Sequence, residues 1–274
     1  MKRAHTCLWG FILLGSLLLA GCVPEVGVEW VQWYSQVKKD NIKNRKDCAE
    51  GFYDILSNYG DWVGDFNKGN SEAHEEHFKR ESKGGTDSRM VDAVDFVYFA
   101  GHGAGSTGLG RGSAITFGVN AYDDWILSVV PSNREPQWGD RDLEFIVLDA
   151  CSFLARKKDG DGVKYTFGER IANTSVIRGV HYIMGFRTYA HDDPDRGQIY
   201  AEYLTGTGSA APSKHTIGKA WMYATELTEW GDVSGAYVRF VSEGVDTKDD
   251  TVDDWCLNPD LESIKYVYNS WPCH

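Results

Sequence analysis

The chain has 274 residues, and its composition already excludes several classes of protein. It carries 28 Lys and Arg against 40 Asp and Glu, which gives a formal net charge of −12 at pH 7. Binding to nucleic acid needs clustered Lys and Arg, and the sequence has no such cluster, so we expect no nucleic-acid partner. Aromatic residues make up 13% of the chain, which argues for a sizeable core and against disorder.

The first residues have the pattern of an export signal. Lys2 and Arg3 are followed by an apolar run from Leu8 to Leu19, shorter than the roughly 20 apolar residues that span a bilayer. The run closes on Leu19-Ala20-Gly21-Cys22, which resembles the lipobox of bacterial lipoproteins. The resemblance implies a signal peptide of residues 1–21 and lipid on Cys22. An ordinary signal peptide with a chance cysteine is the alternative.

We therefore expect an exported protein at the outer membrane or cell surface, held to the membrane by its lipid alone. Residues 22–274 suit one large domain better than two. Of the six cysteines, Cys48, Cys151, Cys256 and Cys273 remain after export and lipidation. An exported compartment permits disulfides, and Cys256 with Cys273 is a candidate pair that would staple the C-terminal tail. Cys48 with either of them is equally allowed, because sequence does not fix connectivity.

Apolar periodicity predicts strands that alternate with helices. Strands are predicted at 28–34, 94–100, 143–148, 180–186 and 236–241, and helices at 47–59, 71–80, 122–130, 167–178, 198–204 and 216–227. Residues 67–70 and the glycine-rich stretch 104–112 read as loops, and the Asp-rich tail after Gly244 as solvated as far as Trp255. The alternation indicates an α/β domain with a mainly parallel sheet flanked by helices.

Two chemically useful side chains follow the predicted strands at 94–100 and 143–148. His102 lies just after the first strand and Cys151 just after the second. Functional groups of open α/β sheets gather at the carboxyl ends of strands, so we expect the two to meet. A nearby histidine can generate the thiolate that acts as a nucleophile. Gly103 has no side chain and would let a substrate come close to backbone N–H groups that stabilise an oxyanion.

The text around both residues resembles a known family. Asp95-Phe-Val-Tyr-Phe-Ala-Gly-His102-Gly103 and Glu144-Phe-Ile-Val-Leu-Asp149-Ala150-Cys151 are similar to the motifs of the caspase-like (clan CD) cysteine peptidases. This group includes caspases, metacaspases, clostripain, gingipains and legumain. The resemblance covers about residues 90–230 at motif level. It implies a caspase-like three-layer sandwich and a cysteine endopeptidase that acts on a peptide or protein without a cofactor.

The resemblance also implies roles for individual residues. His102 would be the general base or acid and Cys151 the nucleophile, with the backbone amides of Gly103 and Cys151 as the oxyanion hole. Asp149 would line the primary specificity pocket. An acidic group there selects Arg or Lys in clostripain-like and metacaspase-like enzymes, because a carboxylate pairs well with a guanidinium.

Asp192 and Asp193 are further candidates for the same negative pocket. Each acidic residue also has a simpler interpretation. Asp149 could cap the helix that follows it. The sequence Asp192-Asp193-Pro194 is typical of a turn that enters a helix.

A catalytically inactive surface lipoprotein that binds peptide or glycan is the main alternative, and the ten tryptophans would suit it. An active Cys151 should react with iodoacetamide near neutral pH faster than an ordinary thiol, which separates the two hypotheses.

Nucleotide binding is a weaker alternative. Gly103-Ala-Gly105-Ser-Thr-Gly108 fits G-x-G-x-x-G with Asp123 at the expected distance, but no helical pattern opens at the last glycine. We expect no metal, because the spacing of His74 and His77 fits no zinc-peptidase motif and the Asp-rich tail fits no EF-hand.

Overall fold

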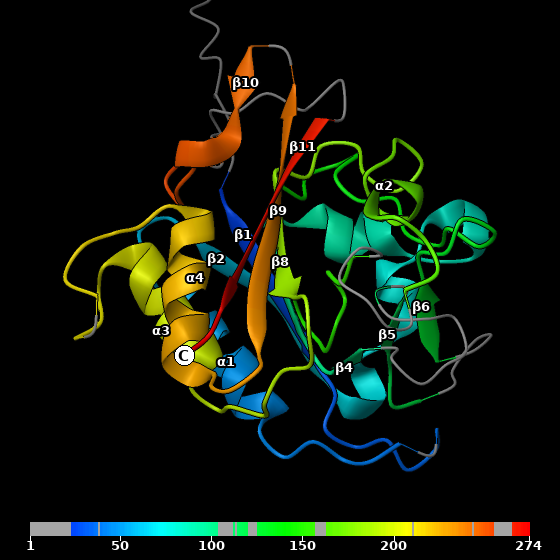
Figure 1. The fold of residues 1–274 in the computed structure, drawn as a ribbon, viewed down its shortest axis with the longest axis horizontal. Coiled ribbons are helices and arrows are strands. Elements are labelled where there is room, and N and C mark those ends of the chain that lie inside the picture. Colours follow the sequence, from blue (N-terminus) through cyan, green and yellow to red (C-terminus); the bar gives the residue numbers. More distant parts are fainter. Residues whose placement is uncertain are drawn as a thin grey trace, which may run out of the picture.

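The fold is seen in a computed structural model that describes residues 23–37, 39–103, 112, 114–119, 125–156, 163–209, 211–242, 244–254 and 265–274. It confirms the predicted α/β architecture: a mainly parallel, mixed central sheet is flanked by helices (Figure 1). None of the helices in the described ranges is long and apolar enough to cross a membrane.

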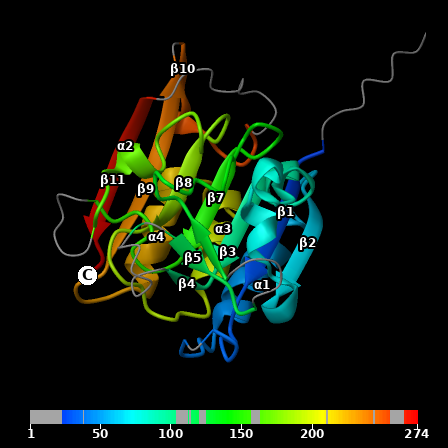
Figure 2. The same ribbon diagram turned by 90° about the vertical axis from the view of Figure 1, so that its right-hand side faces the viewer.

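The central sheet has eight strands in the described residues, in the order β10-β9-β8-β7-β3-β1-β2, with β11 also paired to β9. Strands β2, β1, β3, β7 and β8 run parallel, and β9 pairs antiparallel with β8, β10 and β11. Figure 2 shows β2 at one end of this sheet and β11 at the other. The strands are β1 (Glu25–Trp30), β2 (Val63–Gly69), β3 (Phe96–Ala100), β7 (Phe145–Asp149), β8 (Tyr182–Phe186), β9 (Ser234–Ser242), β10 (Val245–Asp246) and β11 (Lys265–Pro272).

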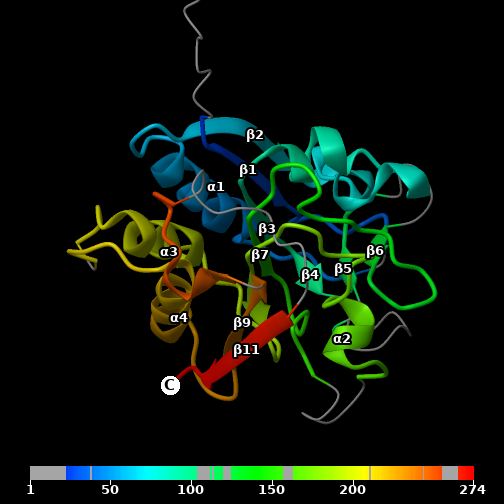
Figure 3. The ribbon, with the colours of Figure 1, turned by 90° about the horizontal axis from the view of Figure 1, so that it is seen from above.

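The two faces of the sheet are covered differently, as Figure 3 shows from above. Helices α1 (Arg45–Leu56), α3 (Arg196–Thr205) and α4 (Ile217–Thr228) pack together on one face. The other face carries a small antiparallel sheet, the short helix α2 (Phe167–Arg170) and several 3₁₀ turns between residues 70 and 93. The small sheet consists of β4 (His102–Gly103), β5 (Ala114–Thr116) and β6 (Ile126–Ser128).

The buried central strands explain why the sequence folds in this way. Every residue of β3, β7 and β8 is buried, as expected for apolar runs in a sheet that is covered on both faces. Alternate residues of these strands therefore point to opposite faces of the sheet and pack into two separate hydrophobic cores. Val97 and Leu148 pack on the side of the small sheet, whereas Tyr98 and Val147 pack on the side of the long helices.

Several predicted elements have the right type but shifted ends. The strand predicted at 28–34 is β1, which ends at Trp30 because the side chain of Asn70 accepts hydrogen bonds from the backbone N–H groups of Gln32 and Trp33. The helices predicted at 47–59, 198–204 and 216–227 are α1, α3 and α4. The strands predicted at 94–100, 143–148, 180–186 and 236–241 are β3, β7, β8 and β9.

Other predictions are wrong because tertiary contacts override local pattern. Most of the loop expected at 67–70 belongs to β2, and the polar helix expected at 71–80 is broken into 3₁₀ turns. His77 in this segment is buried, with its Nδ1 2.6 Å from Glu29 Oε1. The segment therefore packs against the core and does not form a solvated helix.

Two predicted helices are absent or short in the described residues. Residues 126–128 of the segment predicted at 122–130 form strand β6, and residues 120–124 lie outside the described ranges. The helix predicted at 167–178 stops at Arg170. Beyond it, Val176 accepts a hydrogen bond from Trp138 N, and Arg178 N donates to the Trp138 carbonyl.

The C-terminal tail is more ordered than its composition suggests. Thr247 is fully buried within it, and its hydroxyl donates to the carbonyl of Phe240. The following strand β11 pairs along the length of β9. Sequence pattern missed β11 because it mixes polar and aromatic residues on a half-exposed edge.

Candidate active site

His102 is held at the carboxyl end of β3 by contacts from the segment that follows β1. Its backbone N–H donates to Tyr34 Oη over 2.9 Å, and its ring packs on that of Tyr34 with centroids 4.6 Å apart. Its Nε2 lies 2.8 Å from the carbonyl oxygen of Asp40. A carbonyl only accepts, so Nε2 carries a hydrogen and, in the neutral ring, Nδ1 is left as the acceptor.

Cys151 lies on a tight turn at the end of the neighbouring strand β7. The turn places Ser152 in the left-handed region at φ 58°, a conformation that costs a residue with a Cβ about 1–2 kcal/mol. It is held there by hydrogen bonds from Ser152 N to Thr188 O and from Leu154 N to Phe186 O, at 2.5 and 2.9 Å. Strain next to a reactive side chain is a feature of functional sites.

Gly103 is needed for the close approach of the two strand ends. A Cβ added to Gly103 would lie 1.9 Å from the carbonyl oxygen of Cys151 and 3.1 Å from its nitrogen. Only glycine fits there. The backbones of the two residues expected to form an oxyanion hole are therefore in contact.

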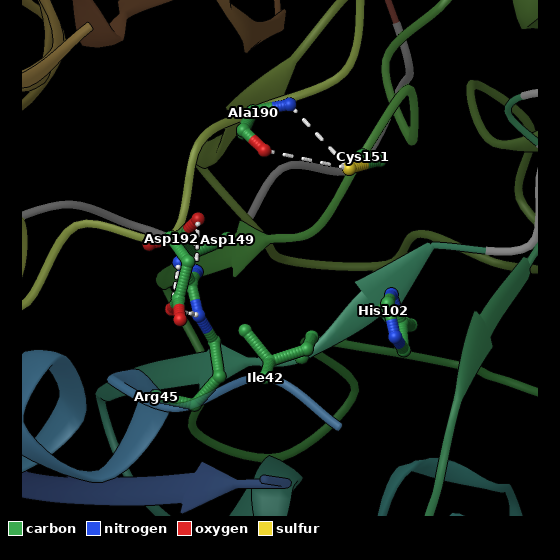
Figure 4. A pocket seen from close by; sticks show the side chains of 8 residues that line it. Ile42, Arg45, His102, Asp149, Cys151, Ala190 and Asp192 are labelled. Atoms are coloured by element: carbon green, nitrogen blue, oxygen red, sulfur yellow. Dashed lines mark hydrogen bonds and ion pairs between the residues drawn. The ribbon is translucent and has the colours of Figure 1, made fainter. Parts of the chain in front are cut away.

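A cavity of about 190 Å³ brings the predicted residues together. Its lining comes from four parts of the chain: Ile42, Arg45, Gly101, His102, Asp149, Cys151, Ala190 and Asp192 (Figure 4). The Cys151 sulfur lies beside Ala190, 3.4 Å from its nitrogen and 3.8 Å from its oxygen. Among the described residues, no hydrogen bond joins the side chains of His102 and Cys151, although both line the same cavity.

Asp149 lies at the cavity wall, but its charge is already paired. It is fully buried, and both its oxygens accept from Arg196 Nη1, at 2.8 and 2.9 Å. Arg45 Nη1 is 3.0 Å from Oδ1, and Tyr98 Oη donates to Oδ2 over 2.9 Å. The two arginines keep the pKa of Asp149 below its usual range in spite of burial. The carboxylate of Asp149 is thus paired within the chain, and the expectation that it selects Arg or Lys stays a prediction.

The other two acidic candidates separate in the structure. Asp192 lines the cavity, where it pairs with Arg45 over 2.8 Å and accepts from the backbone N–H groups of Lys43 and Asn44 at the start of α1. Asp193 does not line the cavity. Its Oδ1 accepts from Asp195 N over 2.9 Å, as expected for a turn that enters a helix.

Residues outside the family motifs complete the site. Arg45, Asp40 and Tyr34 all come from the segment between β1 and the first turn of α1. Lys39 from the same segment donates to the carbonyl of Gly103 over 3.4 Å. Burial lowers the pKa of Lys39, and the negative charge that Cys151 can carry opposes this shift. Nothing in the sequence analysis pointed to this segment.

Arg170 supports the loop behind the nucleophile. Its guanidinium is fully buried and donates to the carbonyls of Phe153 and Ala155, and no carboxylate in the described part of the chain pairs with it. Burial lowers its pKa to about 10. A Cβ at Gly112 would lie 2.3 Å from Nη1, so Arg170 also packs against the chain that returns toward β5.

The remaining predictions concern the other cysteines, the glycine-rich loop and metal binding. Cys22, Cys256, the glycine-rich residues 104–111 and Asp123 lie outside the described residues. Cys48, Cys151 and Cys273 are free thiols. Asp95, Asp142 and Glu144 are the described side chains close enough to share a metal ion, but they lie at the amino ends of β3 and β7, away from the cavity.

Burial shifts the pKa of both His102 and Cys151 toward their neutral forms. It lowers the pKa of His102 below 6.5, helped by the nearby charges of Lys39 and Arg45, so the imidazole is a free base at neutral pH. It raises the pKa of the Cys151 thiol above 9.0. Both shifts favour the neutral form of the side chain, imidazole for His102 and thiol for Cys151.

We predict that iodoacetamide alkylates Cys151 more slowly at pH 7 than it alkylates free cysteine, the opposite of the expectation from sequence. Each unit by which the pKa is raised removes roughly tenfold of the thiolate. The rate should rise with pH through that raised pKa, as followed by mass spectrometry. In a Cys151→Ala control, Cys48 should stay unmodified because burial raises its pKa to about 12. A rate at pH 7 above that of free cysteine would contradict this prediction.

Comparison with known proteins gives a family but no activity. A search of curated proteins found no match to the chain. A family model described as a domain of unknown function, DUF6345, matches residues 28–271. The match begins within β1 and ends within β11, so it contains the whole cavity and every element of the central sheet at least in part. The chain therefore belongs to the DUF6345 family.

Proposed function

We propose that this protein is a caspase-like cysteine endopeptidase in which His102 and Cys151 form the catalytic dyad. The observation that carries the proposal is that both side chains line one cavity at the carboxyl ends of adjacent parallel strands. That is where α/β sheets place reactive groups. The fold, with its parallel β1, β3, β7 and β8, is compatible with a caspase-like sandwich.

The chemistry would be acyl transfer. His102 Nδ1 removes the thiol proton as the sulfur attacks the scissile carbonyl carbon, and the backbone N–H groups of Gly103 and Cys151 stabilise the oxyanion. The peptide C–N bond breaks as the imidazolium returns its proton to the leaving amine. Water, deprotonated by His102, then hydrolyses the thioester and releases the new carboxylate with the free thiol.

The Asp40 carbonyl supports the assignment of His102. A general base is effective when a third group fixes its tautomer and orientation. The hydrogen bond from Nε2 to Asp40 supplies this, and it leaves Nδ1 as the ring atom that can accept a proton. The missing bond between His102 and Cys151 is compatible with catalysis, since such contacts often tighten only when substrate binds.

A non-catalytic peptide-binding module is the second candidate. It is favoured by the position of the Cys151 sulfur, which contacts the backbone of Ala190 in place of His102, and by the raised pKa of the thiol. Both candidates place a peptide in the same cavity, and hydrolysis distinguishes them.

We predict that the purified protein digests a peptide library and that Cys151→Ala and His102→Ala each reduce kcat/KM by at least a thousandfold. Because burial lowers the pKa of His102, the acid limb of the rate profile should lie below pH 6.5. Circular dichroism of each variant serves as the folding control. Undiminished cleavage by Cys151→Ala, or no cleavage by the parent at any pH, would exclude the peptidase in favour of the binding module.

We also propose that the protein is exported and anchored to the membrane through lipid on Cys22. The lipobox-like Leu19-Ala20-Gly21-Cys22 supports this. Labelled palmitate should enter the parent chain and be absent from Cys22→Ala, and the parent alone should partition into the membrane fraction. Equal labelling of both chains would contradict the anchor.

A further inference from the structure

The first described residues are fixed to the central sheet almost from their start. Val23 is 52% exposed, but Pro24 is buried and its carbonyl accepts a hydrogen bond from Val63 N over 2.9 Å. Glu25 then opens β1, which pairs with β2 on one side and with β3 on the other. Val23 is therefore the single residue between Cys22 and the part of the chain that the fold holds in place.

This spacing makes a lipid on Cys22 a very short tether. One residue of extended chain spans at most about 3.6 Å, so the Cα atoms of Cys22 and Pro24 lie within about 7 Å of each other. A flexible linker of about twenty residues, by comparison, keeps its ends about 25 Å apart on average. With so short a tether, the start of β1 stays next to the lipid headgroups, and the domain cannot turn this end away from them.

The cavity lies at the other end of the sheet. It is lined by residues at the carboxyl ends of the parallel strands, among them His102 and Cys151, whereas the tether joins the amino end of β1. Figures 1 and 2 both show the dark-blue start of β1 and strand β4, which contains His102, at opposite ends of the sheet. From Phe96 at the start of β3 to His102, the extended chain covers about 20 Å. A domain tethered in this way presents its cavity away from the tether.

The surface around the tether suits the headgroup region of a bilayer without net charge. Val23 and Val63 are exposed apolar side chains on neighbouring segments of this end. The charged groups beside them are acidic: burial raises the pKa of Glu25, and the negative charge of Asp65 adds to this shift. Acidic groups are repelled by anionic lipid, so a zwitterionic headgroup surface is the partner that this end of the sheet fits.

We propose that this end of the sheet, around Val23 and Val63, lies against zwitterionic lipid headgroups and that the cavity faces the aqueous phase on the far side of the domain. The proposal rests on the proposed lipid anchor at Cys22 and is independent of the peptidase function. It limits the partners of the cavity to polypeptides presented in the aqueous phase, about 20 Å or more from the anchored end. A segment embedded in the same bilayer stays out of reach.

The orientation is tested on the full-length lipidated chain, reconstituted into phosphatidylcholine vesicles that contain a nickel-chelating lipid. A nitroxide is attached to Asp61→Cys or to Asp195→Cys in the Cys151→Ala background, and the background alone is the labelling control. Asp61 lies between α1 and β2 at the anchored end, and Asp195 precedes α3 at the cavity end; both are exposed, so the two substitutions are matched. Nickel shortens the relaxation time of nearby nitroxides, and we expect an enhancement at least fivefold larger for Asp61→Cys than for Asp195→Cys.

A second variant separates the effect of the tether from that of the surface. Inserting a flexible linker of about twenty Gly and Ser residues between Val23 and Pro24 keeps the lipid but frees the domain, so the two enhancements should become equal within twofold. Equal enhancements without the insertion, or a larger one for Asp195→Cys, would overturn the orientation, and a difference that survives the insertion would overturn the role of the tether. Palmitate labelling is scored separately: a parent chain that takes up no lipid would remove the anchor, and the orientation with it.

Discussion

The buried carboxylate of Asp149, held between Arg45 and Arg196, is the interaction on which the rest of the site depends. It lies at the end of β7, and its two partners open α1 and α3, so one charge fastens two helices to the end of the sheet. Removing one partner of such a buried cluster typically costs about 3–5 kcal/mol, because the remaining charge is left uncompensated in the core. The ion cluster also fixes the segment at 190–192, whose backbone contacts the Cys151 sulfur.

The structure gives different roles to Asp149 and Cys151, which the Asp-Ala-Cys motif had assigned to one site. The Asp-Ala-Cys sequence places a carboxylate and a thiol two residues apart, on a strand whose end faces a cavity. The carboxylate turns inward to the arginines, while the tight turn at Ser152 carries the thiol toward Ala190. The pairing of Asp149 inside the chain and the position of the Cys151 sulfur at the cavity therefore follow from the same strand end. The pKa shifts of His102 and Cys151 have a common cause, since burial penalises the charged form of each.

Sequence pattern predicted the parts of this molecule that are local and apolar. The buried runs of β3, β7 and β8 were recognisable, and with them the positions of His102 and Cys151 after two strand ends. The partners were not recognisable. Arg45 meets Asp149 across more than a hundred residues, and nothing in the local sequence of either records this. A pattern of acidic residues suggested a negative pocket because their arginine partners lie far away in the chain.

The covering segments were the least predictable for a similar reason. The 3₁₀ turns after β2 form because side chains such as His77 are buried against the core. Strand β11 forms because it pairs with β9. His102 is oriented by a hydrogen bond that its Nε2–H donates to the backbone carbonyl of Asp40, a partner that no side-chain motif can reveal.

The central claim is that Cys151 is a nucleophile activated by His102 within the cavity. Covalent trapping with a peptidyl chloromethyl ketone, followed by peptide mapping of the adduct, tests it most directly. The account predicts one adduct, on Cys151, whose rate of formation falls at least a hundredfold in His102→Ala while Cys48 and Cys273 stay unmodified. An adduct rate unaffected by His102→Ala, or modification of Cys48 and Cys273 as fast as that of Cys151, would contradict it.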